Sequence, residues 1–212
     1  MGFFDRLDRL AAEHGGVEPL PPGVREAIEL AFVLEERGER ADAEARLLAL
    51  TIDHPRLAAA WRALGDLRHR GADDAGAALA YGRAVDLDPR DLHALVSLAE
   101  CLLALGRDEP ARDTFRRALA QVGDDTFEAR IRVGRGRLAL RAGEVARAAR
   151  ELERAVELAP GDLDAAALLG RALVALGSPE GARWLLHAAR GRPLDVELAL
   201  EAAEAQGHRP EV

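Results

Sequence analysis

Residues 58–91 read AAAWRALGDLRHRGADDAGAALAYGRAVDLDPRD, and the pattern of small, apolar and turn-forming residues in this stretch recurs along most of the chain. Successive copies lie about 34 residues apart, and a period of that length is typical of solenoids built from stacked repeats. One copy precedes this stretch and three follow it. We therefore expect five units, at about 24–57, 58–91, 92–127, 128–161 and 162–192.

Each unit is expected to form two helices that pack as a hairpin. Apolar residues at three- and four-residue intervals place one stripe on a first helix. Asp73 is a candidate N-cap for the second helix, and Pro89 prevents that helix from continuing. Gly65 and Ala77 are small enough to let the two backbones approach, and Tyr81 can fill the adjoining gap. Because one hairpin cannot bury its whole apolar surface, neighbouring hairpins should stack.

The positions that recur hold Ala58, Trp61, Leu64, Gly65, Ala77, Tyr81, Ala84 and Pro89 in the second copy. This set resembles the tetratricopeptide repeat (TPR), although Arg68 stands where the first helix of that family usually carries Tyr. The resemblance covers roughly Val24 to Arg192. It implies an all-α fold, a right-handed superhelical α-solenoid of about five TPR hairpins, followed by a C-terminal capping helix within residues 193–212.

Composition agrees with helices and opposes several classes of function. The chain is 49% hydrophobic, mostly Ala and Leu, with only 4% aromatic residues, a mixture that favours helices over strands. A net charge of −8 opposes nucleic-acid binding, which requires a positive surface. All 29 basic residues are arginines, so a single arginine is weak evidence of function. No export signal or stretch of 18 apolar residues is visible, and we expect a cytoplasmic protein.

The fourth copy departs from the regular spacing and allows two helix registers. Counting back from Pro160 places in the core Arg132, Arg135 and Gly136. A shift of one residue instead places there Ile131, Gly134 and Leu138. We prefer the shifted register because it buries fewer charges. It predicts about three extra residues between Gly123 and Glu128, with Asp125 or Thr126 as the N-cap of the next helix.

The family resemblance also implies a binding surface. In TPR arrays the first helices line a concave wall, and the second, fifth, ninth and twelfth places of each repeat point into it. In this chain those places include Arg25, Ile28, Phe32, Arg62, Asp66, His69, His93, Val96, Glu100, Leu103, Arg137 and Arg171. The fourth copy contributes Arg130, Val133 and Arg137 in one register, or Ala129, Arg132 and Gly136 in the other.

Two interpretations of this wall remain open. Exposed Ile28, Phe32, Val96 and Leu103 beside isolated arginines would suit a peptide or helix with hydrophobic anchors and some acidic groups. Alternatively, neighbouring helices cover Phe32 and Val96, and the charges are ordinary solvated positions. The densest cluster of positive residues also has two interpretations. It could clamp an acidic segment of a partner, or its members could be surface arginines that pair with Glu128, Glu144 and Glu151. Its members are Arg130, Arg132, Arg135, Arg137 and Arg141.

Nothing in the sequence indicates chemistry of its own. The six histidines show no ligand spacing, and no phosphate loop or nucleophile signature is present. Cys101 is the only cysteine, which excludes an internal disulfide, and its apolar surroundings suggest a small buried residue rather than a nucleophile. We therefore expect no enzyme, no catalytic residue, no cofactor and no metal ion.

The two ends differ from the repeats. Residues 1–14 are expected to form an amphipathic helix with docking residues Phe3, Phe4, Leu7 and Leu10, joined by a Gly/Pro linker at 15–23. This helix could fold back on the array, mediate self-association or dock on another partner, whereas a membrane is disfavoured because acids and bases alternate on its polar face. Leu194 to Gln206 should form a helix that seals the last hairpin.

The sequence thus predicts a non-catalytic adaptor that binds a partner peptide or helix, of unknown identity, in the concave TPR groove. The alternative is a structural subunit of a homo-oligomeric or multi-protein assembly. Such a subunit would use its convex faces, the ends of the array and the N-terminal helix.

Overall fold

The computed structural model describes residues 20–21 and 23–207, and within these ranges the chain is all α-helical, with no strand. This confirms the expected fold class. The helices are α2 Val24–Glu36, α3 Arg40–Asp53, α4 Ala58–Arg70, α5 Asp74–Leu87, α6 Leu92–Ala104, α7 Asp108–Leu119, α8 Asp125–Arg141, α9 Val145–Leu158, α10 Leu163–Ala175, α11 Glu180–Gly191 and α12 Val196–Gly207.

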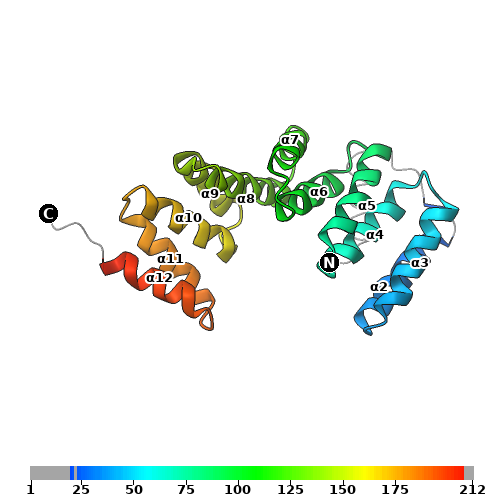
Figure 1. The fold of residues 1–212 in the computed structure, drawn as a ribbon, viewed down its shortest axis with the longest axis horizontal. Coiled ribbons are helices and arrows are strands. Elements are labelled where there is room, and N and C mark those ends of the chain that lie inside the picture. The colour runs from blue at the N-terminus through cyan, green and yellow to red at the C-terminus, as the bar shows by residue number, and fades with distance from the viewer. Residues whose placement is uncertain (1–19, 22, 208–212) are drawn as a thin grey trace.

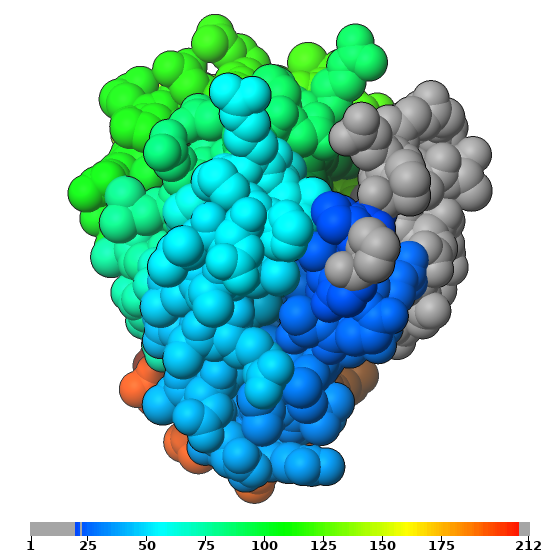
Figure 2. Space-filling model, turned by 90° about the vertical axis from the view of Figure 1, so that its right-hand side faces the viewer, coloured from blue at the N-terminus to red at the C-terminus, as the bar shows by residue number. Residues whose placement is uncertain are grey.

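The helices stack as an elongated, curved array of hairpins. Each helix packs against the next one along the chain, and the first helices of successive hairpins also touch, α6 with α8 and α8 with α10. The array arches from α2 and α3 at one end, past α6 and α7, to α12 at the other (Figure 1). Figure 2 looks at the end formed by α2 and α3.

Small residues let the helices of a hairpin approach, as the sequence predicted. A Cβ placed on Gly65 would lie 2.6 Å from the ring of Tyr81, which is buried against it. A glycine also packs against an aromatic ring between α7 and α8, where the ring of Phe115 leaves no room for a Cβ on Gly134. An aromatic ring and a missing side chain therefore set the helix spacing at both places.

A common turn ends the first helix of each hairpin. Gly38, Gly106, Gly143 and Gly177 take a positive φ there, which glycine adopts without steric cost. In the second hairpin the same place is held by Ala72, with φ 60°. Asp73 follows and accepts the backbone N–H of Gly76, so its predicted role as an N-cap is confirmed.

The fourth hairpin takes the shifted register. Ile131, Gly134 and Leu138 are buried, whereas Arg132 and Arg135 are only partly buried. Helix α8 has 17 residues where α6 and α10 have 13. The predicted N-cap was wrong by one or two positions: Asp124 accepts the backbone N–H groups of Thr126 and Phe127, because its backbone is still extended when the helix begins.

The expected N-terminal helix at 1–14, with Phe3, Phe4, Leu7 and Leu10, lies outside the described residues, as does most of the linker at 15–23. At the other end, α12 buries Leu198 and Ala202 against the last hairpin. In the described part of the chain, no helix is both long and apolar enough to span a bilayer.

Candidate functional site

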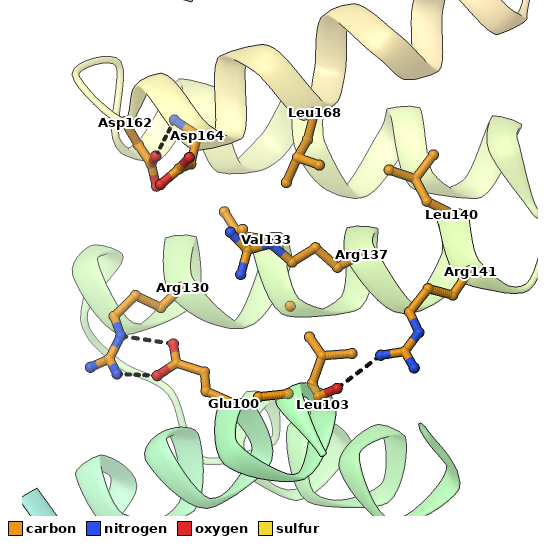
Figure 3. A pocket seen from close by; sticks show the side chains of 12 residues that line it. Glu100, Leu103, Arg130, Val133, Arg137, Leu140, Arg141, Asp162, Asp164 and Leu168 are labelled. Atoms are coloured by element: carbon orange, nitrogen blue, oxygen red, sulfur yellow. Dashed lines mark hydrogen bonds and ion pairs between the residues drawn. The ribbon is translucent and has the colours of Figure 1, made fainter. Parts of the chain in front are cut away.

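A pocket of about 480 Å³ opens between the first helices of the third, fourth and fifth hairpins. Helix α8 forms its floor, with α6 on one side and the start of α10 on the other (Figure 3). The residues that line it are Glu100, Leu103, Ala104, Arg130, Val133, Gly134, Arg137, Leu140, Arg141, Asp162, Asp164 and Leu168.

Two of its arginines are held by groups of α6. Arg130 donates to both carboxylate oxygens of Glu100, over 3.1 and 2.6 Å. Burial by itself would lower the pKa of Arg130, but the charge and hydrogen bonds of Glu100 outweigh it and raise that pKa. Arg141 donates to the backbone carbonyl of Leu103 over 2.8 Å, in the last turn of α6, and lies 3.3 Å from Asp108.

The acidic side chains at the α10 edge are also engaged. Asp162 caps α10 by accepting the backbone N–H groups of Asp164 and Ala165. Asp164 forms an ion pair of 2.8 Å with Arg192. Neither carboxylate is therefore held by a charged group of α8.

Arg137 differs from the other charged residues of the pocket. It is exposed, and it makes no hydrogen bond or ion pair with the residues that the structure describes. In Figure 3 its side chain runs along α8 away from Leu140, and the guanidinium lies beside Val133, with Leu168 on the α10 side and Leu103 on the α6 side. The pocket therefore offers one guanidinium that has no partner among the described residues and lies near apolar side chains, a combination that suits a carboxylate next to an apolar group.

The structure brings together five of the predicted groove residues, Glu100, Leu103, Arg130, Val133 and Arg137. The groove positions that the shifted register predicted were wrong, because Ala129 and Gly136 are buried and Arg132 is paired with Glu128 and Glu151. Of these, Leu103 is mostly buried and contributes only its edge. Sequence analysis did not name Leu140 and Leu168. The three- and four-residue spacing that joins Leu140 to Arg137 and Val133 on one face of a helix is the signal that could have found it.

The interpretation with Ile28, Val96 and Leu103 as exposed anchors was wrong, and the alternative, in which neighbouring helices cover Val96, is confirmed for that residue. Leu103 is 7% exposed. Ile28 and Val96 are 0% exposed, because they face the core between stacked hairpins rather than the open wall. Arg62 is also unavailable to a partner, since it is 6% exposed and forms an ion pair with Asp91. Ile28, Val96 and Arg62 therefore stabilise the array and do not line the pocket.

The remaining predicted positions lie on both sides of the pocket. Asp66 and His93 are joined by a 2.9 Å hydrogen bond, and His69 contacts Asp74. Arg171 forms a bidentate pair with Glu201 of α12. Arg25 and Phe32 are partly exposed, and the guanidinium of Arg70 lies 4.3 Å from the ring centre of Phe32.

The arginine cluster of α8 is mostly paired, as one of its two interpretations expected. Arg132 bonds to Glu128 and Glu151, and Arg135 lies 2.7 Å from Glu151. Glu144 pairs with Arg147 rather than with the cluster. Burial lowers the pKa of Arg135 despite the charge of Glu151. Because Arg130 and Arg141 are also engaged, the cluster is not a general anion clamp.

Comparison with known sequences and structures agrees with this architecture. One sequence profile of the tetratricopeptide repeat matches residues 29–91 and 133–196, and a second matches residues 70–130. No curated protein matches the chain.

Solved structures with the same fold share few residues with this chain. MamA protein is 18% identical, with a TM-score of 0.66 over 89% of this chain and 96% of its own. Pseudomonas aeruginosa PilF is 19% identical, with a TM-score of 0.71 over 86% of each chain. YrrB, described as a TPR protein with an unusual peptide-binding site, is 18% identical, with a TM-score of 0.64 over 93% of this chain and 97% of its own.

Proposed function

Because the chain belongs to the tetratricopeptide repeat family, we propose that it is a non-catalytic cytoplasmic adaptor that binds a peptide or helical segment of another protein. The binding site is the surface of α6, α8 and α10. The observation that carries the proposal is the pocket at Arg137, whose guanidinium has no hydrogen bond or ion pair within the described part of the chain and lies near the apolar Val133, Leu103 and Leu168. The peptide-binding site named for the structurally similar YrrB supports the same kind of ligand.

The proposed ligand carries an acidic side chain next to an apolar one. A carboxylate would accept hydrogen bonds from Arg137, and such charge-assisted pairs are stronger than neutral ones. The apolar neighbour would pack against Leu103, Val133, Leu140 or Leu168. In a helical ligand the two groups would lie three or four residues apart.

The composition of the pocket supports a binding role rather than catalysis. Among the described residues that line it, none is a Ser, Thr, Cys, His or Lys that could act as a nucleophile or general base. Its carboxylates are held by helix caps or arginines. The surface is therefore suited to holding a segment and not to transforming it.

A selection experiment tests the proposal and does not require the identity of the partner. A random peptide library displayed on phage is selected on the full-length chain, and bound peptides are synthesised and titrated by fluorescence anisotropy. We expect enriched peptides to pair Asp or Glu with Leu, Ile or Phe, and the Arg137→Glu variant to lose their binding.

Arg150→Glu is the matched control, because Arg150 is an exposed arginine on α9, away from the pocket lining. The control variant should bind the selected peptides as the wild type does. Peptides that bind Arg137→Glu with unchanged affinity, or that are lost equally in both variants, would contradict a binding site at this pocket.

A second candidate function, a structural subunit of a larger assembly, is favoured by the end of the array. Leu194, Val196 and Leu200 are 94%, 75% and 58% exposed at or beside α12, and large apolar side chains exposed together mark interaction surfaces. If this face joins copies of the chain, light scattering should give an oligomer mass for the wild type and a monomer mass for a Val196→Glu, Leu200→Glu double variant. A wild-type monomer at all concentrations would contradict self-association.

A further inference from the structure

We propose that His69, Asp74 and Cys101 form a binding site for one Zn²⁺ ion, a property that neither the repeat architecture nor the peptide groove requires. The three residues come from three helices: His69 from the last turn of α4, Asp74 from the first turn of α5 and Cys101 from α6. One donor atom from each lies within 4.8 Å of the other two.

The fold brings these residues together in two ways. The tight turn between α4 and α5 places His69 beside Asp74, with 2.8 Å between Nδ1 and Oδ1. Stacking of the next hairpin then brings the Sγ of Cys101 to 3.6 Å from the same Nδ1. Histidine spacing alone could not reveal such a site, because its ligands are separated by a whole repeat.

The donor set has the chemistry that Zn²⁺ prefers. Thiolate sulfur, imidazole nitrogen and carboxylate oxygen are its three usual protein ligands, and a water molecule commonly completes the tetrahedron when the protein supplies three. Calcium and magnesium select oxygen ligands and would leave the sulfur unused. The combination therefore favours zinc over the hard cations.

The distances need little adjustment. Tetrahedral bonds of about 2.0 Å to nitrogen or oxygen and about 2.3 Å to sulfur place donor atoms about 3.3 to 3.6 Å apart. The Sγ to Nδ1 distance of 3.6 Å already satisfies this. The Nδ1 to Oδ1 distance of 2.8 Å is that of a hydrogen bond, so the ion replaces the shared proton and the two atoms separate by about half an ångström.

The electrostatic environment favours a cation. The carboxylates of Asp74 and Glu100 place negative charge near the Cys101 sulfur. A dication in direct contact with that sulfur displaces the thiol proton when it binds. Because His69 and Asp74 are partly exposed while Cys101 is buried beneath them, the ion enters past the two outer ligands.

The test uses the full-length chain, dialysed against a chelator and titrated with Zn²⁺ by calorimetry and with Co²⁺ by absorption spectroscopy. We expect one ion per chain, and with Co²⁺ a thiolate charge-transfer band together with the visible bands of tetrahedral cobalt. Cys101 is the only cysteine in the chain, so the thiolate band has a single source. Zn²⁺ should also raise the melting temperature, because the ion binds the folded state.

His69→Gln and Asp74→Asn alter partly exposed positions, so these variants keep the fold, as circular dichroism will verify. Each should lower the Zn²⁺ affinity at least about tenfold, and Cys101→Ala should abolish the thiolate band. His187→Gln, at an exposed histidine on α11, is the control and should bind as the wild type does. The proposal is overturned if the wild type shows no thiolate band, or if His69→Gln and Asp74→Asn bind Zn²⁺ with unchanged affinity.

Discussion

Arg62 and Asp91 form an ion pair of 2.9 Å between α4 and the start of α6, and both side chains are only 7% exposed. The second oxygen of Asp91 accepts the backbone N–H of Ala94 and caps α6. A single carboxylate therefore satisfies one N–H group at the start of a helix and neutralises a buried guanidinium from the preceding hairpin. The junction between the second and third hairpins depends on both contacts.

Replacing Asp91 by alanine should destabilise the array more than the loss of a cap alone. Breaking a buried pair from one side costs up to about 3 to 5 kcal/mol, because the guanidinium of Arg62 then stays buried without the carboxylate of Asp91. Asp124→Ala removes an exposed cap that has no buried arginine and should cost about 1 kcal/mol. Urea unfolding followed by circular dichroism measures both. Equal losses in the two variants would show that the Arg62 pair contributes nothing.

The stability of the chain should depend on pH through Asp66. Burial tends to raise the pKa of this carboxyl, but the hydrogen bond and charge of His93 and the 2.7 Å hydrogen bond from Tyr81 outweigh it and lower that pKa below its ordinary value of 3.8. A lowered folded-state pKa contributes stability that is present above about pH 3.8 and is lost as the pH falls through the folded value.

The measurement for Asp66 compares the wild type with Asp66→Asn by urea unfolding at about pH 5 and about pH 3. At about pH 5 the wild type should be more stable than Asp66→Asn, and this difference in the free energy of unfolding should shrink at about pH 3. Asp86→Asn, at an exposed position on α5, is the control and should differ from the wild type by less than about 0.5 kcal/mol at both. An advantage that is constant or grows on acidification would contradict the linkage.

Glycines at two helical positions should respond to alanine in opposite directions. At Gly134 an added Cβ would overlap the buried ring of Phe115, and overpacking of this kind costs about 1 to 3 kcal/mol. At Gly82, inside α5, no atom lies within 4 Å of an added Cβ, so alanine should stabilise the helix by about 0.5 to 1 kcal/mol. Thermal and urea unfolding of both variants show whether each substitution raises or lowers the free energy of unfolding. Stabilisation at position 134 would mean that the Phe115 ring moves freely.

Alanine variants of two pocket arginines should distinguish a residue that binds the peptide from a residue that stabilises the fold. Arg137→Ala removes an exposed side chain that is unpaired among the described residues, so the free energy of unfolding should change by less than about 0.5 kcal/mol. The loss of a charged hydrogen bond should weaken binding of selected acidic peptides about tenfold or more.

Arg130→Ala instead leaves Glu100 without its partner and should cost roughly 1 kcal/mol of stability, a modest amount because both side chains are about a third exposed. Peptide titration and urea unfolding of the two variants provide the comparison. If Arg137→Ala lowers stability and leaves peptide affinity intact, Arg137 has a structural role and the binding hypothesis loses its main support.

The sequence by itself determined the helical hairpins, their number and most of their turns. Gly65 opposite Tyr81, Asp73 at a helix start and the shifted register of α8 could all be predicted, because each depends on residues close in sequence or on the avoidance of buried charge. The N-cap at Asp124 was missed because Asp124 and Asp125 are equally suitable N-cap residues by type, and only the backbone angles show where the helix begins.

Only the tertiary structure decided which side chains of the first helices remain available to a partner. A repeat pattern specifies the face of a helix, but the angle between stacked hairpins determines how much of that face the next helix covers, and this buried Ile28 and Val96. Ion pairing depends on differences of a few ångströms between helices, so the sequence could not distinguish Arg137 from the paired Arg132. For the same reason, no pattern along the chain placed the thiol of Cys101 next to His69, one repeat away.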